Sequence, residues 1–143
     1  MERLFRGIYE HQLDDTGRLR IPAKFKKGME EYPEKTYSFV RGLHGCIYVF
    51  PDAVLDETLE ELSDVRLADS TKASRMFFSS VFPAEEDAQV RVTLPSKLKE
   101  AAGIKKDVVT IGLGKRLEIW SAERYNAYVD GADYDEEFRT LGI

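Results

Sequence analysis

Two segments of this chain, 73 positions apart, carry the same residue pattern, and this internal repeat constrains the fold more than any other feature. Residues 14–26 align without gaps with residues 87–99, and five of the thirteen positions are identical: an Asp, an Arg, a Pro and two Lys. Such self-similarity indicates two copies of one supersecondary unit. Because a single short hairpin cannot bury its apolar face, we expect the two copies to pack against each other.

The repeat extends further along the chain. Residues 42–50 resemble residues 112–120 at an offset of 70, so the second copy is three residues shorter than the first. An acidic segment with helical spacing follows each copy. We therefore expect one pseudo-two-fold β-core with helices outside it, rather than two unrelated domains.

Within each copy, the pattern predicts a strand, a turn, a second strand and a short helix. Alternation of side chains favours strands at 4–13 and 18–21, and residues 14–17 suit a turn because Asp accepts backbone hydrogen bonds and Gly tolerates positive φ. Pro22 can open a helix that Gly28 can end. The other expected strands are 37–40, 46–50, 80–86, 91–94, 107–112 and 116–120, and the other expected helices are 51–62, 70–78 with Ala73, Met76 and Phe77 facing inward, 96–102, and 121–129 capped by Ser121.

Charge and composition limit the classes of function. The net charge is −5, but residues 1–51 and 71–120 are net basic, whereas 52–70 and 121–143 are net acidic. A basic face can therefore bind a polyanion although the chain is acidic overall. The single cysteine, Cys46, excludes an internal disulfide and predicts a cytoplasmic location. No apolar run is long enough to cross a membrane, and too few histidines and cysteines are present for a zinc site. We expect no cofactor and no small-molecule substrate.

The repeated motif Asp-x-x-x-Arg is the candidate functional feature. It occurs as Asp14 with Arg18 and as Asp87 with Arg91, where each Asp can cap its turn and orient the Arg. Taken alone, the motif is also compatible with a structural ion pair, which contributes little when exposed. An arginine on a strand beside a turn suits the major groove of DNA, and lysines suit phosphates. The neighbouring basic residues are Arg20, Lys24, Lys26 and Lys27 in the first copy and Lys97 and Lys99 in the second.

These motifs resemble those of the MraZ family of bacterial transcriptional regulators. The resemblance rests on residues 9–25 (YEHQLDDTGRLRIPAKF) and 41–51 (RGLHGCIYVFP), and continues in 75–79 (RMFFS) and 117–121 (LEIWS). It implies an α+β, β-rich fold in which two AbrB-like swapped-hairpin repeats form one pseudo-two-fold β-barrel core with peripheral helices. The implied divisions are a first repeat at 5–51, a helical connection at 52–77, a second repeat at 78–121, and a C-terminal helix with an acidic tail at 122–143.

The resemblance also implies a function. It implies a nucleoid-associated homo-oligomer in the form of a ring. This ring is expected to bind double-stranded DNA at promoter direct repeats upstream of the division and cell-wall gene cluster and to repress its own promoter. The DNA-binding residues are then Asp14, Arg18, Arg20, Lys24, Asp87 and Arg91.

Two departures from the family pattern affect the turns. Thr16 stands where the family usually has Lys, and Val90 stands where it usually has Gly. Because a β-branched residue is poorly suited to positive φ, the second turn is expected to differ from the first or to be strained, and to read DNA more weakly.

Two other functions remain open on the sequence. A ring-forming structural protein without specific DNA binding would share the same repeats. An enzyme could use the adjacent acids at Glu85–Glu86–Asp87 or at Asp14–Asp15, but acids in polar turns are usually solvated, and we expect no catalysis.

Overall fold

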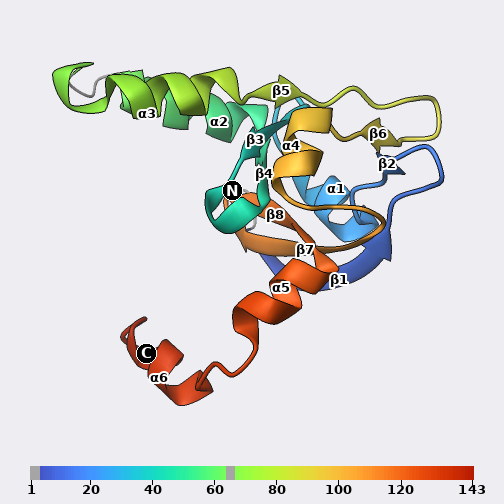
Figure 1. Cartoon of the computed structure of the whole chain (residues 1–143). Coiled ribbons are helices and arrows are strands. Elements are labelled where there is room, and N and C mark those ends of the chain that lie inside the picture. The colour runs from blue at the N-terminus through green and yellow to red at the C-terminus, as the bar shows by residue number, and fades with distance from the viewer. Residues whose placement is uncertain (1–3, 64–66) are drawn as a thin grey trace.

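The sheet that carries most of the core is antiparallel and open. The computed structural model describes residues 4–63 and 67–143. The strand order is β1 (Phe5–Gln12), β7 (Asp107–Gly114), β8 (Arg116–Ser121), β4 (Ile47–Pro51), β3 (Tyr37–Arg41) and β5 (Phe82–Pro83), with helices around the sheet (Figure 1). The expected α+β class is confirmed. The expected closed barrel is not confirmed, because the order of the described strands ends at β1 on one side and at β5 on the other.

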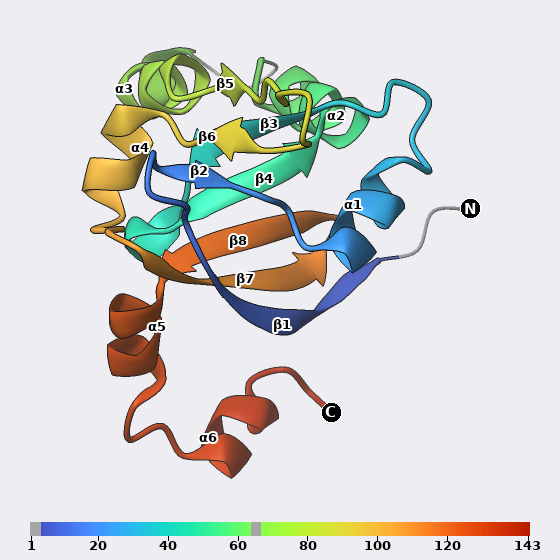
Figure 2. The same cartoon turned by 90° about the vertical axis from the view of Figure 1, so that its right-hand side faces the viewer.

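A second sheet of two strands joins the two copies. β2 (Arg18–Leu19) pairs antiparallel with β6 (Val92–Thr93), and Leu19 lies opposite Val92. These two residues are equivalent at the offset of 73, so a local two-fold axis passes through the pair. Figure 2 shows β2 and β6 side by side, in front of strands β3 and β4 of the main sheet. The short second strand of each copy therefore pairs with that of the other copy, rather than with its own neighbour.

The helices begin where the local residues favour a start. Their bounds are α1 (Ala23–Met29), α2 (Asp52–Ser63), α3 (Leu67–Ser79), α4 (Ser96–Ala101), α5 (Ala122–Val129) and α6 (Tyr134–Arg139), with a 3-10 turn η1 (Leu43–Gly45) between β3 and β4. Pro22 and Pro95 hold equivalent positions immediately before α1 and α4. Ser121 caps α5 as expected, since its hydroxyl oxygen accepts a hydrogen bond from the Arg124 amide at 3.3 Å. The expectation that Gly28 ends α1 is wrong, because Met29 continues the helix and is buried in the core.

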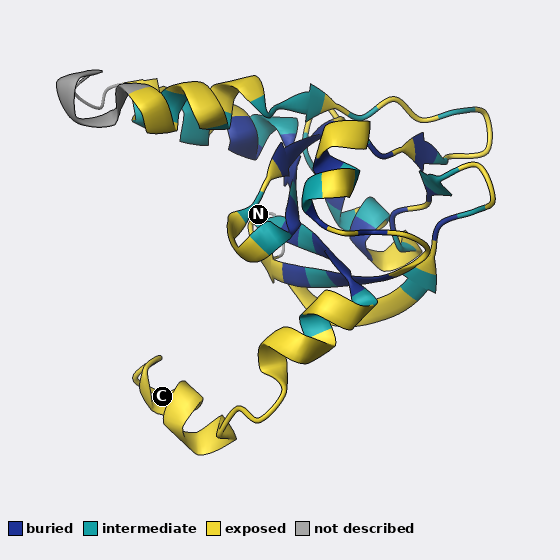
Figure 3. Cartoon of the chain, in the orientation of Figure 1, coloured by how far each residue is buried: buried dark blue, intermediate teal, exposed yellow. Residues whose placement is uncertain are grey.

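One hydrophobic core contains equivalent residues from both copies. Phe25 of α1 and Leu98 of α4 are equivalent at the offset of 73, and both are buried in the same cluster. Phe50 and Trp120, near the ends of equivalent strands, are buried in two separate smaller clusters. Full burial of one such side chain contributes about 1.5–3 kcal/mol. Figure 3 shows the buried residues concentrated on the sheet. Each copy therefore buries apolar residues in a core that the other copy also lines.

Two expectations about the segment between the copies are wrong. The strand expected at 80–86 is reduced to Phe82–Pro83 and an isolated bridge at Glu86. Pro83 lacks the N–H that a longer ladder needs, which suits this edge position. The helix expected at 70–78 is present as part of α3, but Ala73 and Met76 are exposed and only Phe77 packs on a core cluster. The start of that helical segment, residues 70–71, falls where the side chains lie outside the described residues.

Gly112 is required by the close approach of β1 and β7. It pairs with Gly7 across these strands, and a Cβ at Gly112 would collide with the backbone of Arg6. A side chain at this position would therefore push β1 away from the sheet.

Candidate nucleic-acid interface

The first Asp-x-x-x-Arg motif forms a tight turn that Asp14 organises. Turn one is defined as residues 14–18. One carboxylate oxygen, Asp14 Oδ1, accepts hydrogen bonds from the backbone amides of Thr16 and Arg18, both at 2.9 Å, and from the Thr16 hydroxyl at 2.8 Å. The backbone closes the turn from the Gly17 amide to the Asp14 carbonyl at 3.0 Å, with φ of 78° at Gly17. The expected capping role of Asp14 is confirmed.

The second motif repeats this geometry despite Val90. Turn two is defined as residues 87–91. Asp87 Oδ1 accepts from the amides of Gln89 and Arg91 at 2.8 and 2.9 Å, and the Val90 amide donates to the Asp87 carbonyl at 3.0 Å. Val90 adopts a φ of 62° and leaves 47% of its surface exposed. Of the two outcomes expected for this turn, the structure has the strained one. A backbone outlier of this kind costs about 1–3 kcal/mol.

The β2–β6 pairing brings the two motifs together as a ring of four charged side chains. We call Asp14, Arg18, Asp87 and Arg91 the quartet. Within each motif, the Arg Nε lies 3.1 Å (Arg18) or 3.0 Å (Arg91) from the Oδ2 of its own Asp. Between the motifs, Arg18 Nη1 lies 3.3 Å from Asp87 Oδ2, and Arg91 Nη1 lies 3.4 Å from Asp14 Oδ2. Each guanidinium therefore bridges both carboxylates, and each carboxylate contacts both guanidiniums.

Hydrogen bonds within the turns keep both carboxylates ionised. The backbone amide of Arg18 is the main cause that lowers the pKa of Asp14, and the hydroxyl and amide of Thr16 and the Arg18 charge lower it further. The backbone amide of Arg91 is likewise the main cause that lowers the pKa of Asp87. Donors to a carboxylate stabilise its charged form. The quartet therefore keeps two negative and two positive groups at neutral pH.

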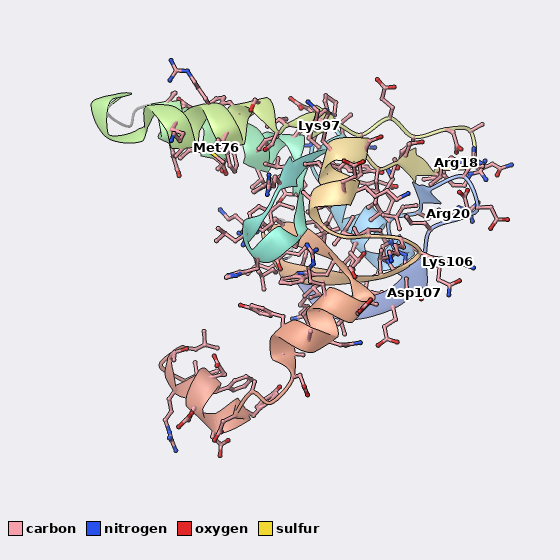
Figure 4. The ribbon with its side chains drawn as sticks, in the orientation of Figure 1. Arg18, Arg20, Met76, Lys97, Lys106 and Asp107 are labelled. Carbon is pink, nitrogen blue, oxygen red and sulfur yellow. The ribbon has the colours of Figure 1, made fainter. Side chains whose placement is uncertain are left out.

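Arg20 and Lys24 lie outside the quartet. Arg20 follows β2, is exposed, and lines a cavity of about 750 Å³ beside turn two together with Lys27 and Val90. Lys24 is exposed on α1 and lines a separate groove of about 430 Å³. Arg18 and Arg20 lie on the same side of the molecule (Figure 4). The structure thus brings Arg18 and Arg91 into one cluster and leaves Arg20 and Lys24 as separate exposed cations.

Lys106 is a basic residue near the turns that the sequence analysis did not single out. Its carbonyl accepts a hydrogen bond from the Leu13 amide at 2.9 Å, which places exposed Lys106 beside the start of turn one. Figure 4 shows it on the same side as Arg18 and Arg20. The signal in the sequence was the pair of lysines at 105–106, directly before a strand.

Lys26 has a different environment from the one expected for a phosphate contact. Its ammonium lies 3.4 Å from Glu86 and 3.6 Å from Glu30, and only 17% of the side chain is exposed. Glu86 also accepts a hydrogen bond from the Tyr37 hydroxyl at 2.7 Å. Burial, together with this carboxylate, raises the pKa of Tyr37. These contacts give Lys26 and Glu86 a structural role between α1 and the start of turn two.

The remaining polar motifs are accounted for by packing. Cys46 is buried, and burial raises the pKa of its thiol to about 12, so it packs as a small apolar residue. Residues 112–115, which loosely resemble a phosphate loop, lie in the β7–β8 hairpin.

Within residues 4–63 and 67–143, no group of three or more His, Cys, Asp or Glu side chains is arranged to hold a metal ion. The same residues form no helix of the length and apolar character needed to span a bilayer.

The fold and the quartet define a tandem-repeat protein that presents two equivalent Asp-x-x-x-Arg turns from one surface. A family model described as "MraZ protein, putative antitoxin-like" matches residues 4–79 and again residues 76–140. The chain therefore belongs to the MraZ family, and the two matches confirm the repeat.

Relatives in several bacteria share this family. A protein named Transcriptional regulator MraZ from Natranaerobius thermophilus is 39% identical to this chain, and the alignment covers 91% of this chain and 90% of the relative. The protein of the same name from Heliobacterium modesticaldum is also 39% identical, and the alignment covers 93% of each chain. The protein of that name from Lactobacillus gasseri is 40% identical and covers 93% of both chains.

Proposed function

We propose that this chain is a sequence-specific DNA-binding transcriptional regulator whose two turns contact DNA. The quartet carries the proposal, because it holds two guanidinium groups side by side at the ends of a two-stranded ribbon. Such a ribbon fits the major groove of B-DNA, where arginine pairs with the O6 and N7 atoms of guanine. The names of the relatives agree with a role in transcription.

The carboxylates of the quartet orient the arginines without using all of their hydrogen-bond donors. Each guanidinium engages Asp14 and Asp87 through Nε and Nη1. A guanidinium has five N–H donors in a fixed plane, so donors remain for a base edge or a phosphate. Holding the side chain in place before binding reduces the entropy lost when DNA is bound.

The distribution of acidic residues over the molecule also supports the end that carries the two turns as the surface that contacts DNA. The two turns lie at one end of the molecule, whereas α2, α3 and α6 lie toward the opposite end and α5 lies below the sheet (Figure 1). The acidic stretches of the sequence, 52–70 and 121–143, are contained mostly in those four helices. Because exposed charges are screened over about 8–10 Å, the acidic helices need not repel DNA held at the turns.

The full proposal includes the target and the assembly. The protein binds direct repeats upstream of the division and cell-wall gene cluster, represses its own promoter, and acts at the nucleoid as a ring-shaped homo-oligomer. Family membership supports these statements. Exposed Arg20, Lys24 and Lys106 are then contacts to phosphates that position the turns.

The experiment is a fluorescence anisotropy titration with two duplexes of equal length. One duplex carries the region upstream of the protein's own gene, and the other carries the same bases in scrambled order. We expect tighter binding to the first, with affinity that falls steeply between 50 and 200 mM salt. The double variant Arg18→Ala/Arg91→Ala should lose the preference, whereas Lys72→Ala on α3 removes a positive charge away from the turns and should retain it. Equal affinity of the unaltered protein for both duplexes would instead favour a ring-forming structural protein.

A further inference from the structure

The C-terminal segment forms a capped helix that has almost no contact with the rest of the protein. We call residues 130–143 the tail. Asp133 caps α6 by accepting hydrogen bonds from the amides of Asp135 and Glu136 at 3.0 and 3.2 Å. The rings of Tyr134 and Phe138 stack on one side of the helix with centroids 4.4 Å apart. Figures 1 and 2 show α6 standing away from the body, and every residue of the tail is exposed (Figure 3).

This helix needs a surface to pack on. Tyr134 is 73% exposed, and Phe138, four residues further on, lies on the same face of α6; Leu141, in the turn that follows the helix, is 66% exposed. A helix of six residues is too short to be stable in water by its hydrogen bonds alone. The local cap and the aromatic pair specify the helix, but a partner surface must supply most of its stability.

A groove on the opposite side from the turns offers a matching surface. We call it the aromatic groove; it has a volume of about 380 Å³ and lies between η1, the β7–β8 hairpin and α5. Its wall includes the exposed apolar residues Leu43, Leu113 and Tyr128. Trp120 lies behind Tyr128, with ring centroids 5.1 Å apart. Exposed apolar residues gathered around one groove typically mark an interaction site.

The charges of the groove and the tail are complementary. Arg116 lines the groove, lies over the ring of Tyr48 at 4.2 Å, and pairs through Nη2 with the carboxylate of Glu118 at 3.4 Å, so these two lining charges balance each other. Lys115 is exposed in the adjacent hairpin turn. The tail carries five acids, Asp130, Asp133, Asp135, Glu136 and Glu137, against one base, Arg139. An acidic helix with an apolar face therefore suits a groove with apolar walls that has the exposed Lys115 beside it.

In this structure, the tail and the groove of one chain do not meet. Tyr128 and Val129, at the end of α5, already form part of the groove wall, and the chain then leaves in an extended conformation at Asp130. Both apolar surfaces are exposed in the single chain, so a second copy can cover both.

We propose that the tail of one copy docks in the aromatic groove of a second copy. The interface is heterologous, since a tail on one subunit meets a groove on the next, and such contacts form a closed ring when their rotation closes. This inference rests on the proposed homo-oligomer and names the segments that hold it together.

The first test compares matched substitutions of exposed apolar residues. Phe138→Asp places a charge on the docking face of α6, whereas Met76→Asp does the same on α3, away from the groove; Met76 is 60% exposed. By light scattering at micromolar concentration, we expect Phe138→Asp to reduce the oligomer to monomers and Met76→Asp to leave its mass unchanged. A Phe138→Asp variant of unchanged mass would overturn the proposal. A charge exchange adds a second readout: Lys115→Glu should weaken assembly, and Glu136→Lys should restore it in that background.

The second test distinguishes docking between copies from docking within one chain. A Leu113→Cys variant is mixed with a Phe138→Cys variant under mild oxidation, with Cys46 replaced by Ala in both. We expect a disulfide-linked dimer that contains one chain of each kind. In the doubly substituted chain, exclusive formation of an intrachain disulfide would overturn docking in a second copy.

Binding to a duplex with a single repeat separates this proposal from the proposed function. Phe138→Asp should still bind that duplex through its turns. Loss of binding by the unaltered protein would contradict the DNA-binding function, whereas an unaltered oligomer that tolerates Phe138→Asp would contradict only the docking of the tail.

Discussion

Arg18→Ala tests whether the quartet is a DNA contact or only a structural ion pair. The substitution removes the hydrogen bonds to Asp14 at 3.1 Å and to Asp87 at 3.3 Å. The backbone bonds that close turn one involve the amides of Asp14, Thr16 and Arg18, and these survive. Because exposed ion pairs contribute little to folding, we expect the fold to persist.

The loss of DNA affinity follows from two effects. One bidentate contact between arginine and guanine contributes about 1–3 kcal/mol, which corresponds to roughly a 5- to 150-fold change in affinity for each turn. In addition, Arg91 then faces both carboxylates alone, at 3.0 and 3.4 Å, and is held back from DNA. The double variant Arg18→Ala/Arg91→Ala should therefore lose less than the sum of the two single losses, with a coupling of about 0.5–3 kcal/mol.

The assay is anisotropy on the upstream duplex at fixed salt, with circular dichroism and light scattering as controls. The sequence alone predicts a weaker second turn, but both turns have the same hydrogen bonds, so we now expect Arg91→Ala to lose nearly as much affinity as Arg18→Ala. If the loss of affinity in the double variant equals the sum of the losses in Arg18→Ala and Arg91→Ala, the quartet does not act as a unit. Full affinity in Arg18→Ala would refute turn one as a DNA contact and return the motif to a structural role.

Four further predictions concern the fold. Val90→Gly should raise the thermal midpoint by a few degrees, because it removes strain at a φ of 62°; a lower midpoint would show that Val90 stabilises turn two. Gly112→Ala should lower the free energy of unfolding in urea markedly, because its Cβ meets the Arg6 backbone. A fragment of residues 1–69 should not unfold cooperatively by circular dichroism, since its core partners lie in the second copy. Cys46 should not react with a thiol reagent at pH 8, because its pKa, near 12, keeps the thiol protonated; rapid labelling of folded protein would contradict its burial.

Features set by neighbouring residues could be predicted from the sequence. The Asp14 cap, the Ser121 cap and the buried strand ends at Phe50 and Trp120 each follow from local residue chemistry, and all are present. The internal repeat also predicted that both copies share one core.

Features set by contacts between distant segments were harder to predict. The cross-copy ion pairs of the quartet depend on the register of β2 with β6, which places Leu19 opposite Val92. No local pattern fixes that register. Exposure of Met76 was missed because the helical spacing of apolar residues does not show whether a neighbouring element covers them. The open sheet was missed for a similar reason. Alternation of side chains predicts strands, but it does not show whether the two edge strands, β1 and β5, pair to close a barrel.

The pairing of Leu19 with Val92 gives a single chain the two-fold arrangement of a dimer. Because the two halves belong to one chain, their residues can differ. Two separate copies of a single unit would have to carry the same residues at both turns. In this chain, Thr16 and Gly17 of turn one correspond to Gln89 and Val90 of turn two. A subunit built this way has a polarity, because its two turns differ in chemistry. Two-fold symmetric proteins bind palindromic sites, so under the proposed function a polar subunit repeated head to tail would match DNA sites that all point in one direction.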